Sequence, residues 1–202
     1  LVDKQLENGA WFYNDQSRIE PDCGDTSITQ YAVLGLWAAS RCDVEVPSGT
    51  LEKAAMWHIA KQREDGGFAY HPYEKKGSGE EKVGLPTMTA AGTSSLLIIR
   101  RMLFGEAGLD VELKPVNPKK KFGVLERLGD EKAVKAAKKR NSAINVAVID
   151  DSLKKSIRWL VTRAGTKNQR HDMYFTYDLY CIERVAALLD VDEIGGRDWY
   201  DE

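Results

Sequence analysis

The stretch that decides the fold is KAAMWHIAKQREDGGF, residues 53–68. Its second half has a glutamine, a glycine four residues later, and an aromatic residue two residues after that. This spacing occurs twice, as Gln5, Gly9 and Trp11 in a first copy and as Gln62, Gly66 and Phe68 in a second. Residues 155–160 repeat the first half more weakly, and Ala164 stands where the glutamine would fall. Such self-similarity predicts a chain built from repeated units.

Each copy is followed by a helix-length stretch of small and apolar residues that begins with polar residues. The three stretches are residues 25–39, 86–99 and 173–188. Their apolar residues occupy nearly all helical faces, which is typical of a helix buried on several sides. Polar side chains that can cap the first turn of a helix are Asp25, Thr26, Ser27 and Thr87.

Residues 49–63 and 151–163 have a different, amphipathic pattern, with Lys and Arg along one side. The chain therefore alternates an amphipathic helix, a glycine-containing turn and a more buried helix. A single pair of such helices cannot bury its apolar face, so neighbouring pairs must stack. With the solvated helices outside and the small-residue helices inside, the array curves. We predict an all-α fold in which antiparallel helix pairs stack into an α/α toroid, as a whole or an incomplete ring. The only β-like stretches, residues 44–46 and 145–149, are short.

Composition excludes several classes of function. The 202 residues carry 29 Lys and Arg against 31 Asp and Glu, a net charge of −2, so we expect no nucleic-acid partner. No apolar run approaches the length that a membrane-spanning helix needs, so we expect no membrane span. The three cysteines, Cys23, Cys42 and Cys181, are odd in number and far apart, which indicates neither a disulfide framework nor a cysteine zinc site. The cellular compartment is left open.

We predict a single repeat domain over residues 1–202, with a basic insertion at about residues 105–147. The insertion carries many lysines and few acids, but it lacks the interleaved aromatic residues that stack on bases, so we favour a solvated insertion over an anion-binding patch. Residues 1–5 look like the tail of an outer helix, and residues 198–202 look like the start of another. We therefore expect the chain to be a piece of a longer protein.

The register of residues 53–68 resembles the QW repeat of squalene-hopene and oxidosqualene cyclases, which form one α/α-toroid superfamily with the protein prenyltransferases. It is most similar to bacterial proteins of unassigned function that carry prenyltransferase and squalene oxidase repeats. The sequence departs from the repeat at His58, where an aliphatic residue is usual, and at Phe68, where Trp is usual. The resemblance implies structural roles for Gln5, Trp11, Trp57, Gln62 and Phe68. A glutamine side chain can satisfy backbone groups at neighbouring helix ends and tie outer helices together.

The catalytic signatures of the family are incomplete here. Cyclases protonate their substrate with a DxDD aspartate set, and residues 22–26 read DCGDT, so Gly24 stands where the middle acid belongs. Capping of a helix is the alternative role for Asp25. Prenyltransferases hold zinc with an Asp, a Cys two residues later and a distant His. No DxC occurs, and in residues 170–176 Phe175 falls where the histidine belongs, so we expect no metal and no cofactor.

In this superfamily the chemistry lies at the N-terminal ends of the inner helices, and the resemblance directs the choice of site residues to those ends. The catalytic candidates are Asp22, Asp25, Asp172 and Asp178, and the ligand-binding candidates are Gln30, Thr89, Tyr174 and Tyr177. An internal ion pair is the alternative role for Asp178.

Three functions stay open. We prefer a repeat domain that binds a small apolar ligand or a protein partner in its concave face without the family chemistry. The second is an enzyme acting on an isoprenoid or polyprenyl substrate, in the manner of squalene cyclases. The third is a carbohydrate-active α/α toroid with facing carboxylates, in which Tyr174 and Tyr177 would stack on sugars. Whether the chain is an enzyme is therefore undecided from the sequence.

Overall fold

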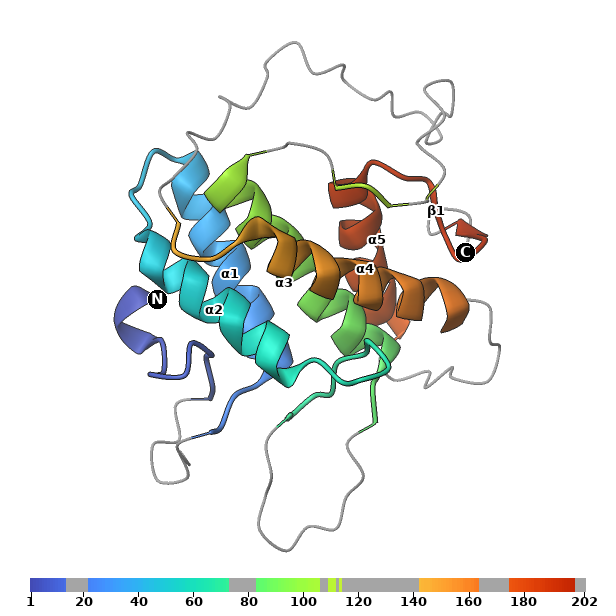
Figure 1. Cartoon of the computed structure of the whole chain (residues 1–202), viewed down its shortest axis with the longest axis horizontal. Coiled ribbons are helices and arrows are strands. Elements are labelled where there is room, and N and C mark those ends of the chain that lie inside the picture. The colour runs from blue at the N-terminus through green and yellow to red at the C-terminus, as the bar shows by residue number, and fades with distance from the viewer. Residues whose placement is uncertain are drawn as a thin grey trace, which may run out of the picture.

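The computed structural model describes residues 1–13, 22–72, 83–105, 109–111, 113, 142–163 and 175–198. Their regular structure is almost entirely helical, which confirms the all-α prediction (Figure 1). The elements are the short 3-10 helix η1 (Val2–Lys4), the helices α1 (Thr26–Arg41), α2 (Ser48–Lys61), α3 (Pro86–Phe104), α4 (Val146–Arg163) and α5 (Phe175–Leu189), and the strands β1 (Glu193–Ile194) and β2 (Arg197–Asp198).

The helices lie where the pattern of small and amphipathic stretches predicts them, with ends displaced by a few residues. Residues 146–149, which have β-like character in the sequence, open α4 instead. The two strands form a minimal antiparallel pair in which Glu193 is opposite Asp198, a pairing that no pattern in the sequence predicts. Most of the expected basic insertion lies outside the described residues.

The helices form two layers with α3 at the centre. α3 contacts α1 and α5 in its own layer and α2 and α4 in the other layer, which lies toward the viewer in Figure 1. Almost every residue from Met88 to Leu103 is buried, and small side chains in this helix let its neighbours approach closely. The alternation of solvated and buried helices along the sequence therefore becomes an alternation between the two layers.

The glutamine of each repeated copy ties a turn to the following outer helix through both hydrogens of its amide. The acceptors, at 2.9–3.0 Å, are the carbonyls of Gly9 and Thr50 for Gln5 and those of Gly66 and Ser152 for Gln62. Thr50 lies in the first turn of α2, which confirms the expected role at a helix end. Ser152 lies further inside α4, because α4 begins earlier relative to its copy of the pattern.

The two copies place glycine at the same strained position. Gly9 and Gly66 have φ angles of +99° and +93°, a region that residues with a side chain rarely adopt. A Cβ at Gly66 would lie 2.6 Å from the carbonyl oxygen of Lys155 in α4. The turn can therefore approach the outer helix only if this position has no side chain.

We predict that Gly66→Ala lowers the free energy of unfolding by about 2–4 kcal/mol, because it adds both backbone strain and a clash with α4. Gly49→Ala is the matched control, since a Cβ at Gly49 in α2 meets nothing within 4 Å. Helix propensity predicts that this control is neutral or stabilising. Urea unfolding followed by circular dichroism measures both, and equal effects of the two substitutions would contradict the close approach.

His58 is a polar side chain in the apolar interior between the layers. It is fully buried, neither ring nitrogen has a hydrogen-bond partner, and the rings of Trp57 and Phe68 lie 5.0 and 5.7 Å away, centroid to centroid. Burial lowers the pKa of His58 from 6.5 to about 3. The imidazole is therefore neutral in the folded protein, and it packs as an aromatic side chain between Trp57 and Phe68.

Acid should destabilise the fold through this residue. The unfolded chain takes up a proton at His58 below pH 6.5, whereas the folded chain does not until about pH 3, so stability falls as the pH drops through that window. We expect a loss of about 2 kcal/mol between pH 7 and pH 5 that His58→Leu abolishes. Urea unfolding at the two pH values tests this, and an unchanged pH dependence in the variant would exclude His58 as its source.

Candidate functional site

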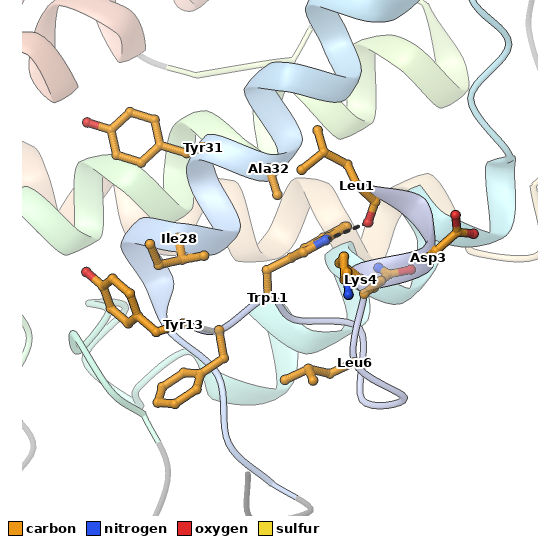
Figure 2. A pocket seen from close by; sticks show the side chains of 11 residues that line it. Leu1, Asp3, Lys4, Leu6, Trp11, Tyr13, Ile28, Tyr31 and Ala32 are labelled. Atoms are coloured by element: carbon orange, nitrogen blue, oxygen red, sulfur yellow. Dashed lines mark hydrogen bonds between the residues drawn. The ribbon is translucent and has the colours of Figure 1, made fainter. Parts of the chain in front are cut away.

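A groove of about 600 Å³ lies beside α1 at the N-terminal side of the molecule (Figure 2). Its volume is in the range of small-molecule pockets. The N-terminal segment and α1 form its walls with mostly apolar and aromatic side chains, among them Leu6, Trp11, Phe12, Tyr13, Ile28 and Tyr31. Asp3 and Lys4 supply the charged groups of the lining. Apolar surface is therefore the main feature that this site offers to a guest.

Trp11 anchors the N-terminal wall of the groove. Its indole nitrogen donates a hydrogen bond to the carbonyl of Leu1 at 2.9 Å, drawn in Figure 2, and its backbone amide donates to Thr29 Oγ1 in α1 at 3.0 Å. Next along the chain, the hydroxyl of Tyr13 lies 3.3 Å from that of Tyr70. Burial raises the pKa of Tyr70 to about 12, so this phenol stays protonated at neutral pH. Bonds to α1 and to the segment of Tyr70 therefore hold this wall in place.

Asp25 lies at the N-terminal end of α1, three residues before the groove residue Ile28. Its carboxylate accepts hydrogen bonds from the Ile28 amide at 2.9 Å and from Ser27 Oγ at 2.6 Å, and it pairs with His71 Nε2 at 2.9 Å. The alternative role of Asp25 as a helix cap is thereby confirmed. Thr87, also a capping candidate, lies inside α3 instead, and Leu85 occupies the cap position.

The electrostatics of Asp25 favour the ionised form. Complete burial raises the pKa of this carboxyl, but the hydrogen bonds from His71, Ser27 and the Ile28 amide lower it by more, so the pKa lies below its ordinary value of 3.8. Asp25 is therefore a carboxylate at neutral pH. A carboxyl that protonates an alkene must carry a proton, and this one does not.

Three tyrosines gather where α1 meets α5. The rings of Tyr31, Tyr177 and Tyr180 have centroids 6.4–6.5 Å apart, and the guanidinium of Arg184 lies 3.9 Å from the ring centre of Tyr180. Tyr31 belongs to the groove as well as to this cluster. Burial raises the pKa of Tyr177, so its phenol also keeps its proton.

The ligand-binding candidates of the inner helices are engaged inside the protein. Gln30 is fully buried: its amide nitrogen donates to Ser94 Oγ at 3.2 Å and its amide oxygen accepts from the Tyr177 hydroxyl at 3.0 Å. Thr89 is also fully buried, and its Oγ1 accepts a hydrogen bond from the Phe68 amide. The structure therefore brings Gln30 and Tyr177 together as a link between α1, α3 and α5.

The four catalytic candidates have different positions. Asp25 is buried at the start of α1, whereas Asp22 is exposed and pairs with Lys61 at 2.5 Å. Asp178 is half-buried in the first turn of α5. Asp172, and with it the ligand-binding candidate Tyr174, lies outside the described residues.

Sequence reasoning missed the apolar residues of the groove. Phe12, Tyr13, Ile28 and Tyr31 carry no catalytic signature, and their periodicity is that of ordinary packing residues. The one available signal is the aromatic run of residues 11–13, which directly follows the first turn. Whether such a residue lies in the core or in an open groove depends on which elements cover it. A single sequence does not contain that information.

Within the described residues, no three His, Cys, Asp or Glu side chains come together as metal ligands. None of the described helices is long and apolar enough to cross a membrane. All three cysteines are free, with Cys23 and Cys181 buried and Cys42 exposed.

Comparison of the chain with protein-family models, with curated proteins and with solved structures finds no match. The resemblance to the cyclase and prenyltransferase repeat therefore stays a prediction that rests on the spacing of residues 53–68 and its earlier copy. Any function for the chain has to be argued from the geometry of its own residues, above all the groove beside α1 and the buried carboxylate at the start of that helix.

The pair of Asp25 and His71 predicts a distinct pH dependence. Asp25→Asn keeps the size and the capping oxygen but removes the charge, and we expect a loss of about 1–3 kcal/mol at pH 7. Because the pKa of Asp25 is lowered in the folded state, its contribution is present above about pH 4 and is lost as the pH falls through the folded pKa. The stability gap to the wild type should therefore close below pH 4 in urea unfolding. Asp22→Asn is the control, because Asp22 is exposed, and it should change the free energy of unfolding by less than about 0.5 kcal/mol. If the stability difference between Asp25→Asn and the wild type persisted below pH 4, Asp25 would not be the source of the pH dependence.

Proposed function

We propose that this chain is a binding domain with an α/α scaffold like that of the squalene cyclase and prenyltransferase superfamily, in the form of an incomplete toroid. Two features support the scaffold: the helices alternate between two layers, and each repeated glutamine ties a turn to an outer helix. The domain binds an apolar guest in the groove beside α1, and it does not carry out the chemistry of that superfamily.

The observation that carries this function is the groove itself. It combines a volume of about 600 Å³ with an aromatic and aliphatic lining, and its wall includes Tyr31, which is 47% exposed. Burying such surface is favourable by about 25 cal/mol for each Å² of apolar area removed from water. A guest that fills the groove thus gains affinity without any reacting group.

The state of Asp25 supports binding over catalysis. In the cyclases a protonated aspartate at the start of an inner helix supplies the proton that begins the reaction. Here the corresponding carboxyl is ionised, and all of its described contacts serve the helix cap and the pair with His71. The isoprenoid enzyme and the carbohydrate-active toroid have no comparable observation in their favour.

Titration with the apolar dye ANS tests this function. We expect one saturable site with enhanced fluorescence, and Ile28→Glu should weaken binding by about tenfold or more because it puts a charge into the groove wall. Met56→Glu is the control, since Met56 is exposed on α2 and does not line the groove. Leu6→Glu provides a second variant from the opposite wall, and circular dichroism confirms that each variant is folded. Equal affinity of folded Ile28→Glu and wild-type protein would refute the groove as the binding site.

A further inference from the structure

The packing of α1 against the second repeated unit indicates which kind of guest can bind in the groove on the first unit. The first turn of α1 lies on the segment that follows the second repeated turn: Thr26 donates hydrogen bonds from its hydroxyl to the Ala69 carbonyl at 2.7 Å and from its amide to the Tyr70 carbonyl at 3.1 Å. Beyond this turn, α1 packs along α3. One helix of this chain is therefore already docked against the second repeated unit.

The groove occupies the corresponding place on the first unit. The spacing that relates Trp11 to Phe68 also relates Phe12 and Tyr13, which line the groove, to Ala69 and Tyr70, which carry the first turn of α1. The correspondence extends into the inner helices. The Trp11 amide donates to Thr29 Oγ1 as the Phe68 amide donates to Thr89 Oγ1, both at 3.0 Å.

The same correspondence relates the groove wall on α1 to buried positions of α3. Counting from Thr29 and Thr89, the groove residues Ile28, Tyr31 and Ala32 match Met88, Ala91 and Gly92. The three positions of α3 are buried, whereas on α1 only Ala32 is buried, Tyr31 is 47% exposed and Ile28 is partly exposed. The first unit thus leaves open, at Ile28 and Tyr31, part of a surface that is covered in the second unit.

We infer that the groove is the docking site for an α-helix of a protein partner, which lies against α1 as α1 lies against α3, with its first turn over Phe12 and Tyr13. This inference rests on the binding function proposed above and names the class of guest. The partner helix has small and apolar residues along one face, like α1, and a polar residue at its start. Because Tyr31 is larger than Ala91, the guest needs Gly or Ala opposite Tyr31 for the two helices to approach.

A peptide with the sequence of residues 24–41, GDTSITQYAVLGLWAASR, is the probe, since it reproduces the helix that fills the corresponding surface. It carries a fluorescent label at its C-terminus, and anisotropy is measured as the 202-residue chain is added. We expect saturable binding with a Kd of about 1–100 μM, and no binding of a peptide with the same residues in scrambled order.

Two chain variants locate the bound peptide. Tyr31→Glu should raise the Kd by about tenfold or more, and Met56→Glu should leave it unchanged, although both residues are 47% exposed. A peptide that displaced α1 from α3 would not respond to Tyr31→Glu in the chain, and that result would overturn the inference. Ile28→Glu replaces Tyr31→Glu if circular dichroism shows that the latter is not folded.

The outcomes separate this inference from the function on which it rests. Binding of ANS without binding of the peptide would overturn the helix guest and leave the groove as a small-molecule site. Binding of neither would overturn both. Sedimentation of the chain alone tests a third outcome, in which the chain associates with itself. Self-association that Tyr31→Glu abolishes would overturn the inference of a protein partner and identify a second copy of the chain as the occupant of the groove.

Discussion

The side-chain amide of Gln62 joins the carbonyls of Gly66 and Ser152, and much of the architecture depends on this bond pair. It connects a turn to an outer helix far along the chain, so it fixes where α4 lies relative to the turn that follows α2. The positive φ of Gly66 follows from the same constraint, because the turn must come within contact of the α4 backbone. Gln5 makes the equivalent pair at α2, and the two bonds set the outer layer on which the inner helices pack.

The two repeated units share these contacts but differ in what covers them. The second unit has α1 along its inner helix α3, which α2, α4 and α5 contact as well, and nearly all of α3 is buried. On the first unit the corresponding surface is the groove between the N-terminal segment and α1. Apolar residues that are core in one unit therefore line an open groove in the other. The difference arises from the neighbours of each unit and not from its own composition.

Polar groups inside the domain serve different purposes. Asp25 is buried as an ion, and hydrogen bonds from Ser27 and the Ile28 amide, together with the pair with His71, offset the cost of its burial. Gln30 links three inner helices through Ser94 and Tyr177. His58 has no such partners and stays neutral. The start of α1 is thus organised for capping and stability.

The sequence by itself determined the helices, and it offered capping as one of two roles for Asp25 and a tie between helix ends as the role of the glutamines. The helices and the cap follow from local periodicity and from hydrogen-bond chemistry within one turn, whereas the outer helix that each glutamine reaches lies 45 or 90 residues away. Only the tertiary structure decided that Gln30 and Thr89 are enclosed, that His71 meets Asp25, and that Tyr31 remains open to solvent. Those outcomes depend on how segments far apart in the sequence pack together, because burial is a property of neighbours and not of the residue that is buried.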